Sequence, residues 1–163
     1  MSYYSLSFDT AVDHVPRPVP IIRVDPQDTT APRKAVKTLR AGGLVVFPTA
    51  EGYMVGCSSL DATAVRRLTE VTGVAPDALV QLAASREQAD RLRGPVRITT
   101  DPVPLALMRD AGTPMAATAC RPGARPAPTA QHVVFVLGDN VDLVLDAGAV
   151  GREPAAETAA AMR

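Results

Sequence analysis

Polar side chains follow directly after an apolar run in the first third of the chain. Residues 44–47 read Leu-Val-Val-Phe, and residues 48–57 then contain the Thr49 hydroxyl, the Glu51 carboxylate and the Tyr53 ring. Ligands bind open α/β sheets just beyond the carboxyl ends of strands, so we predict that these three side chains contact a ligand. Glu51 is also a candidate general base, because a carboxylate within reach of a substrate proton can accept it. An ordinary connection between two strands would explain the same segment.

A second polar loop, residues 118–123, also begins where an apolar stretch ends. Successive backbone N–H groups in a glycine-containing loop can bind an anion, and Arg121 adds a positive charge. We therefore predict that Thr118, Cys120 and Arg121 contribute to a binding site. Cys120 is a candidate nucleophile, because a neighbouring cation favours the thiolate. A packed, inert cysteine is the alternative, and no histidine stands nearby in the sequence to act as its base.

Charge and metal-ligand patterns argue against several classes of protein. The 17 basic and 17 acidic residues balance, whereas nucleic-acid-binding domains are usually basic. Five arginines could still converge in a local patch or remain separate surface charges: Arg91, Arg93, Arg97, Arg121 and Arg125. His14 and His132 are too far apart in sequence for a zinc motif, so no metal site is predicted. Without a run of ~20 apolar residues or a secretory signal, we expect a cytoplasmic protein with no membrane partner.

The apolar periodicity predicts a single α/β domain with a mixed sheet. Strands alternate with helices for most of the chain, and two apolar runs around a Gly-Asp-Asn turn predict a closing hairpin. The predicted strands are 21–24, 44–47, 78–83, 96–99, 115–118, 133–137 and 141–145. Predicted helices begin near Thr30, Asp61, Ser85 and Asp101, residues that can cap the first turn. Residues 1–19 are expected to be an irregular lead-in, 20–150 the domain, and 151–163 an alanine-rich tail.

These motifs, in this order, resemble the YrdC-like domain of threonylcarbamoyl-AMP synthases. In that family a Gly-Gly pair leads into a strand and a Pro-Thr-Asp-Thr-x-Tyr segment, and later come Arg-Val-Pro-x-x-Pro, Ser-Ala-Asn and Asp-x-Ile-x-Asp-Gly-Gly. The corresponding segments here are LRAGGLVVFPT at 39–49 with Tyr53 beyond it, RITTDP at 97–102, TAC at 118–120 and VDLVLDAG at 141–148. The resemblance extends from about residue 20 to residue 150.

The resemblance implies a twisted α/β fold with a concave, partly basic cavity. Such proteins condense threonine, bicarbonate and ATP into threonylcarbamoyl-AMP for tRNA modification, and related domains bind double-stranded RNA or handle carbamoyl-adenylates. It therefore implies a nucleotide or other small molecule as ligand, ATP with Mg²⁺ as cofactors, and RNA as an alternative partner. Thr49, Tyr53, Arg97 and Thr118 would line the cavity.

Several residues that the family uses for chemistry are replaced. The family places Lys-x-Arg after the second helix to hold a triphosphate, whereas residues 69–77 contain neither Lys nor Arg. Two such cations make charge-assisted hydrogen bonds of about 1.5–3 kcal/mol each. Ala50 stands in place of an aspartate, Cys120 in place of an asparagine, and the stretch between Leu92 and Val96 is shortened.

Three hypotheses about function follow from these observations. The first is a divergent YrdC-like protein that binds a nucleotide, a carbamoyl-type molecule or RNA and lacks standard synthase activity. The second is an enzyme, either an active synthase or one with changed chemistry in which Glu51 is the base. The third is an interaction protein, a homodimer in which Tyr3, Tyr4 and Phe8 pack against a second subunit.

Overall fold

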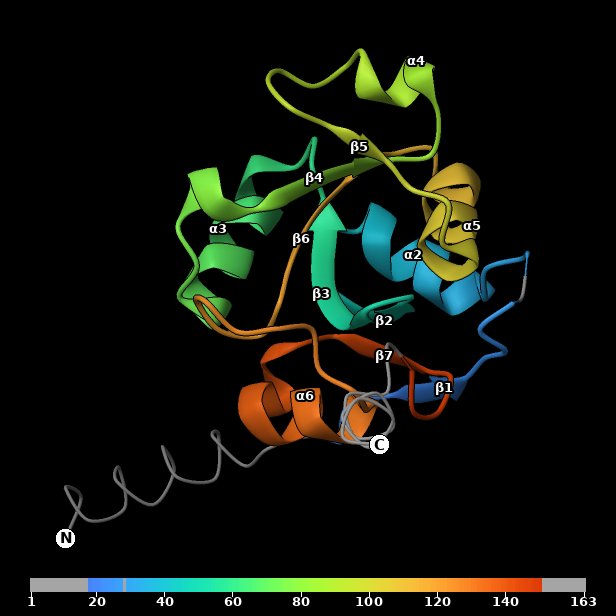
Figure 1. Cartoon of the computed structure of the whole chain (residues 1–163), viewed down its shortest axis with the longest axis vertical. Helices are drawn as coiled ribbons and strands as arrows, with labels where there is room; N and C mark the ends of the chain where they lie inside the picture. The colour runs from blue at the N-terminus through green and yellow to red at the C-terminus, as the bar shows by residue number, and fades with distance from the viewer. Residues whose placement is uncertain (1–17, 28, 151–163) are drawn as a thin grey trace, which may run out of the picture.

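Seven strands form one mixed sheet with helices on both faces (Figure 1). The computed structural model describes residues 18–27 and 29–150. The strands are β1 (Ile21–Arg23), β2 (Val45–Thr49), β3 (Gly52–Ser58), β4 (Val80–Ala83), β5 (Arg97–Ile98), β6 (Met115–Thr118) and β7 (Leu143–Asp146). The helices are α2 (Arg33–Arg40), α3 (Ala62–Thr72), α4 (Arg86–Ala89), α5 (Pro102–Ala111) and α6 (Ala130–Leu137), with short 3₁₀ turns η1 (Pro76–Ala78) and η2 (Gly138–Asn140). The predicted α/β class with a mixed sheet is confirmed.

The strand order is β1-β7-β2-β3-β6-β4-β5. β1, β7 and β2 run parallel, and so do β4 and β5, while β3 is antiparallel to both β2 and β6. β2 and β3 are joined by a tight turn at Ala50 and Glu51, so this segment is a hairpin. Because β3 and β6 are antiparallel, the start of β3 lies beside the end of β6. The β2–β3 turn and the loop after β6 therefore lie close together.

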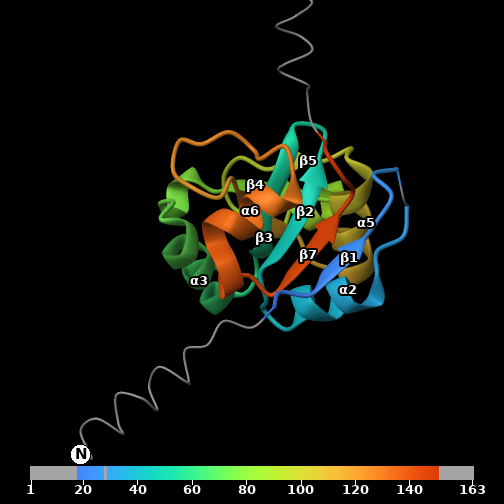
Figure 2. The ribbon, with the colours of Figure 1, turned by 90° about the horizontal axis from the view of Figure 1, so that it is seen from below.

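Alternating side chains divide the core into two layers. Val45 and Phe47 of β2 pack with α2 and α5, whereas Leu44 and Val46 pack with α3 and α6. This follows from the two-residue period of a strand, which sends successive side chains to opposite faces. Figure 2 shows α6 and α3 on one side of the sheet, with α2 and α5 on the other.

The predicted closing hairpin is wrong, because residues 130–137 form helix α6. The Thr129 side chain caps this helix by accepting a hydrogen bond from the His132 N–H at 3.2 Å. Ala130, Val133 and Leu137 are then buried on one face at helical spacing. A run rich in valine favours a strand only weakly, and here packing against the sheet and the cap at Thr129 outweigh that preference.

Most predicted helix boundaries are confirmed, with one exception. Asp61 caps α3 by accepting from the Ala64 N–H at 3.0 Å, and Gly73 ends it in the left-handed conformation. Ser85 caps α4 in the same way. Helix α2, however, begins only at Arg33, after Pro32 in the capping position and without a side-chain cap.

The predictions about both chain ends lie largely outside the described residues. The lead-in (1–19) and the alanine-rich tail (151–163) therefore stay predictions, as does the role of Tyr3, Tyr4 and Phe8. Among residues 18–27 and 29–150, no helix combines the length and the hydropathy of a membrane span.

Candidate functional site

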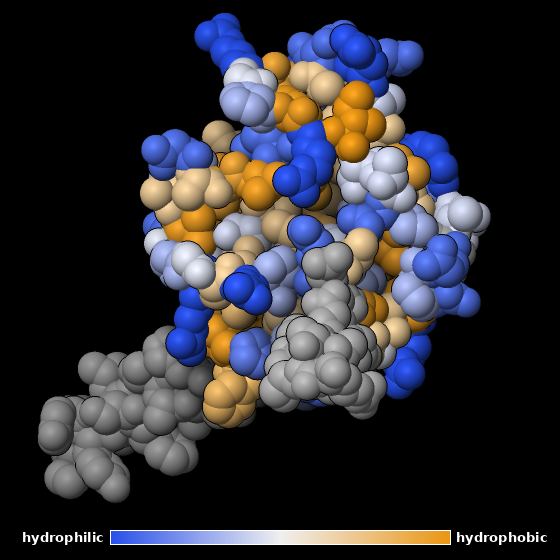
Figure 3. All heavy atoms as spheres, viewed as in Figure 1, coloured by the Kyte–Doolittle hydropathy of each residue, from blue (hydrophilic) through white to orange (hydrophobic). Residues whose placement is uncertain are grey.

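A cavity of about 550 Å³ opens where the β2–β3 turn meets β4, β5 and the loop after β6. Polar and charged side chains line part of its wall: Thr49, Glu51, Arg97, Thr99, Asp101, Thr118 and Arg121. The rest of the wall is mainly apolar: Met54, Val74, Ala75, Ala78, Val80, Leu82, Ala119 and Pro122. Figure 3 shows hydrophilic and hydrophobic side chains side by side on this face of the molecule. Ligand cavities typically measure about 300–1,000 Å³, so this one has room for a molecule the size of a nucleotide.

The β2–β3 turn brings two of the predicted site residues to the cavity. The Thr49 hydroxyl donates to the Gly52 carbonyl at 2.7 Å and accepts from the Glu51 N–H at 3.2 Å, so it holds the turn together. Asp101 Oδ1 accepts from the Ala50 N–H at 3.1 Å and ties the turn to the start of α5. Glu51 lines the cavity but is exposed. Its catalytic role stays a prediction.

Gly52 allows the loop after β6 to lie against β3. The Tyr53 N–H donates to the Ala127 carbonyl at 2.6 Å, and the Ala127 N–H donates back at 3.2 Å. Gly52 has φ +136°, and a Cβ there would lie 2.7 Å from the Ala127 carbonyl oxygen and 2.8 Å from that of Pro126. Only glycine avoids both the strain and the collision. This contact fixes the loop that carries Arg121 across the cavity.

Two arginines in the cavity wall have no partner within the described residues. The ion pairs found there are Arg67–Asp142 and Arg109–Asp110, and neither Arg97 nor Arg121 donates a hydrogen bond to a described residue. Thr118 is 7% exposed and lines the cavity, and none of the hydrogen bonds found among the described residues involves its hydroxyl. An unpaired guanidinium can bind a carboxylate or phosphate through two parallel hydrogen bonds. These three side chains therefore make the cavity suited to an anionic group.

The five arginines of the predicted patch do not all converge. Arg97 and Arg121 line the cavity. Arg93 lines an adjacent groove together with Asp77, and Arg91 donates to the Gly112 carbonyl at 3.4 Å. The cationic part of the cavity is thus a pair of side chains.

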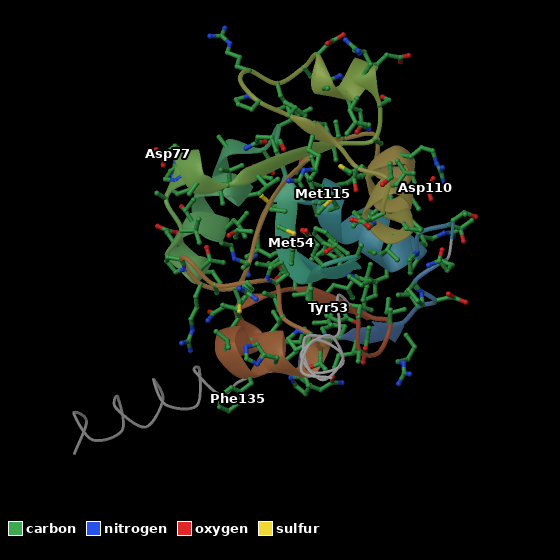
Figure 4. All side chains as sticks on the ribbon, viewed as in Figure 1. Tyr53, Met54, Asp77, Asp110, Met115 and Phe135 are labelled. Atoms are coloured by element: carbon green, nitrogen blue, oxygen red, sulfur yellow. The ribbon has the colours of Figure 1, made fainter. Side chains whose placement is uncertain are left out.

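Tyr53 lies on the opposite face of β3 from the cavity. Its neighbour Met54 faces the cavity, and Figure 4 shows the two labelled side chains in the centre of the molecule. The buried Tyr53 hydroxyl donates to the Gly148 carbonyl at 2.6 Å and accepts from the Ala147 N–H at 2.7 Å. Burial is the main cause that raises the pKa of Tyr53. In this geometry Tyr53 stabilises the end of β7 and does not line the cavity.

Cys120 lies in the hydrophobic core that includes residues of α3 and α6, and it is 5% exposed. Burial raises the pKa of its thiol, while its own backbone N–H and the charge of Arg121 act in the opposite direction with smaller effect. Cys120 is thus packed in the core in this structure, and its role as a nucleophile or ligand contact stays a prediction.

Sequence reasoning missed one acidic residue and most of the apolar wall. Asp101 precedes Pro102 and is the N-cap residue of α5, but its side chain bonds to the β2–β3 turn and not to its own helix. The chain that follows α3 contributes Gly73, Val74 and Ala75, without a cation. Only the assembled fold reveals these contacts, because the residues lie far apart in sequence.

Candidate metal ligands among the described residues are the side chains of His, Cys, Asp and Glu. No group of three His, Cys, Asp or Glu residues that could hold a metal ion occurs in the part of the chain that the structure describes. Glu51 and Asp101 both line the cavity and could each supply a carboxylate oxygen.

Comparisons with known proteins identify the fold. The chain is 25% identical to the threonylcarbamoyl-AMP synthase of Bacillus subtilis (strain 168) over 72% of its own length. The crystal structure of P. abyssi Sua5 complexed with L-threonine matches with a TM-score of 0.67 and 22% identity over 80% of this chain. E. coli YciO matches similarly, with a TM-score of 0.66 and 20% identity, over 82% of this chain and 86% of that protein. The described residues therefore share the fold of these YrdC-like structures.

The YrdC-like domain accounts for only part of two of these relatives. The match covers 46% of the B. subtilis synthase and 51% of P. abyssi Sua5, so this chain spans about half their length. No family model matches the sequence. These comparisons establish the fold, and the chemistry of the cavity has to be argued from its own residues.

Proposed function

We propose that the cavity binds an anionic small molecule of nucleotide size and that the domain lacks the standard threonylcarbamoyl-AMP synthase reaction. The unpaired guanidinium groups of Arg97 and Arg121 beside the free Thr118 hydroxyl carry this proposal. Each hydrogen bond from a charged donor to a phosphate or carboxylate contributes about 1.5–3 kcal/mol. The two arginines are thus sufficient for one anionic group.

The rest of the cavity suits the uncharged part of such a ligand. Met54, Val80 and Leu82 provide an apolar surface on which a base or an acyl chain can pack. Glu51 and Asp101 lie across the same cavity and offer oxygen acceptors. If ATP is bound with Mg²⁺, the ion would be held by its phosphates and by one of these carboxylates, since Mg²⁺ needs few protein ligands.

The apolar wall after α3 supports the loss of the standard reaction. Gly73, Val74 and Ala75 line the cavity where the resemblance leads us to expect Lys-x-Arg. A triphosphate bound here would lack that clamp and would retain only Arg97 and Arg121. We therefore expect a ligand with one or two anionic groups to bind better than a triphosphate.

Calorimetric titration of the full chain tests the binding site. The ligands are AMP, ATP with Mg²⁺, and carbamoyl phosphate, each titrated into the parent protein and into Arg97→Ala and Arg121→Ala. We expect each substitution to weaken binding of the preferred ligand about tenfold or more, the effect of losing one charge-assisted hydrogen bond. Arg93→Ala is the matched control, because Arg93 lies in the adjacent groove, and its affinity should stay within about twofold of the parent value. Equal affinity in the parent protein and in Arg97→Ala would mean that this site is wrongly assigned.

An enzyme with changed chemistry is the second candidate, because Glu51 lies in the cavity wall. Product formation that disappears in Glu51→Gln would favour it over binding alone. RNA binding and a homodimer stay predictions, and a short RNA duplex included in the titration would test the former.

A further inference from the structure

A groove of about 560 Å³ adjoins the cavity beside the edge strand β5. Val80 and Arg97 line this groove and also line the cavity, so the two hollows meet at these residues. Ligand cavities typically measure about 300–1,000 Å³. The groove therefore has room for a second group as large as the one that the cavity accepts.

The groove is present because β5 covers only the second half of β4. β4 pairs with β6 from Val80 to Leu82, whereas β5 pairs only with Leu82 and Ala83. On the β5 side, Val80 and Gln81 lie opposite residues 93–97, and no strand among the described residues pairs with them there. Figure 1 shows the loop between α4 and β5 at the outer end of the sheet. The start of β4 is thus an open edge against which a ligand can lie.

Three polar side chains of the groove are available to a ligand. Asp77 and Arg93 are both exposed, and none of the hydrogen bonds or ion pairs found among the described residues involves either side chain. Figure 4 labels Asp77 at the end of the fold that carries η1 and α3. The Gln81 amide oxygen accepts from the Ser59 hydroxyl at 2.9 Å, which leaves its amide N–H groups for a ligand. The groove thus offers one carboxylate, one further guanidinium and one amide.

This combination suits a nucleoside better than a second anionic group. The carboxylate of Asp77 would repel an anion, but a carboxylate accepts hydrogen bonds from ribose hydroxyls. The guanidinium of Arg93 can stack on the face of a base, and Leu79 and Val96 add apolar surface to the same groove. Arg97 lines both hollows and can bind phosphate oxygens at the point where they meet.

We propose that the cavity and the groove together bind a dinucleotide, two nucleosides joined through phosphates. One nucleoside packs in the cavity against Met54, and the linking phosphates lie at Arg97 and Arg121. The second nucleoside lies in the groove, with its ribose at Asp77 and its base at Arg93. This inference rests on the proposed function, because it starts from the anionic group held at Arg97.

Calorimetric titration of the full chain with ADP and with diadenosine diphosphate tests the proposal. The two probes share one adenosine and two phosphates, and only the second probe carries another adenosine. We expect the parent protein to bind diadenosine diphosphate about tenfold more tightly than ADP, the effect of stacking one further base. Asp77→Ala and Arg93→Ala should each reduce this preference about threefold and together abolish it, while the affinity for ADP stays within about twofold of the parent value.

Arg91→Ala is the matched control. Arg91 is exposed and stands two residues before Arg93, but it lies in a different hollow and donates to the Gly112 carbonyl at 3.4 Å. Its substitution should leave the affinities for both probes unchanged. Because Asp77 and Arg93 are exposed as well, all three substitutions should preserve the fold.

Three outcomes would overturn the proposal. Equal affinities for ADP and diadenosine diphosphate in the parent protein would show that no second nucleoside is bound. A preference for the dinucleotide that survives in Asp77→Ala/Arg93→Ala would place the second adenosine outside the groove. In both cases, binding of ADP that depends on Arg97 would leave the proposed function standing. Absence of binding for both probes, and for AMP and ATP, would overturn the proposed function and the dinucleotide site together.

Discussion

The contact at Gly52 yields the sharpest prediction about how the cavity is built. Replacement by alanine places a Cβ 2.7 and 2.8 Å from two backbone oxygens, which cannot swing aside as a flexible side chain would. The residue also keeps φ +136°, where non-glycine residues are strained by about 1–3 kcal/mol. The loop after β6 must either accept the strain or move away from β3.

The expected loss of stability follows from these two costs. If the loop moves, the two backbone hydrogen bonds between Tyr53 and Ala127 break, each with a net value of about 0.5–1.5 kcal/mol. Together with the strain, we expect Gly52→Ala to lower the free energy of unfolding by about 2–6 kcal/mol. Arg121 would shift with the loop, so affinity for the cavity ligand should fall as well.

Urea unfolding followed by circular dichroism measures the effect, with Gly123→Ala as the matched control. Gly123 lies in the same loop at φ +72°, but a Cβ there meets nothing within 4 Å. Its substitution therefore costs only the left-handed backbone, about 1–2 kcal/mol. Equal losses in the two variants would refute the close approach of the loop to β3 as the reason for Gly52.

Two further predictions concern a buried thiol and a half-exposed ion pair. Burial raises the pKa of Cys57 from 9.0 to about 12, so the folded protein holds this proton more tightly than the unfolded chain. This contribution to the free energy of unfolding should be fully present below about pH 9 and fall by about 1.4 kcal/mol per pH unit above it. Urea unfolding at pH 8 to 10 should therefore show a smaller fall of the free energy of unfolding with pH in Cys57→Ala than in the parent protein. An identical pH dependence in the two proteins would contradict this. Asp142 accepts from Arg67 at 2.6 and 3.2 Å and from the Leu44 N–H at 2.8 Å, so Asp142→Ala should cost about 1–3 kcal/mol. A double-mutant cycle with Arg67→Ala should show coupling of about 0.5–1 kcal/mol, and strictly additive losses would count against the pair.

Six of the seven strands and most helix starts could be predicted from the sequence because their signals are local, whereas β3 (Gly52–Ser58) was not predicted. Capping residues such as Asp61 and Ser85 and the glycine at 73 act within one turn of their own helices. Helix α6 was missed because its valine-rich run has the local preference of a strand, and its helical form depends on packing against distant strands.

The candidate site was predictable only in part, for a related reason. Thr49, Glu51, Arg97, Thr118 and Arg121 follow or begin strands and line the cavity. Tyr53 and Cys120 stand in the same segments but lie in the core. For Tyr53 the alternation of strand β3 decides the face, and sequence alone does not identify the buried side. Cys120 lies in the loop after β6, whose path the sequence does not reveal. Asp101 contributes through a bond to residue 50, which no pattern of nearby residues could reveal.

The central claim is that the cavity binds an anionic ligand without the standard synthase reaction. The most direct test is titration of the full chain with ATP and Mg²⁺, repeated with threonine and bicarbonate present and with pyrophosphate monitored. We predict binding that depends on Arg97 and Arg121 and no release of pyrophosphate. Release of pyrophosphate that requires threonine and bicarbonate would contradict the account and show that the reaction persists without the Lys-x-Arg clamp.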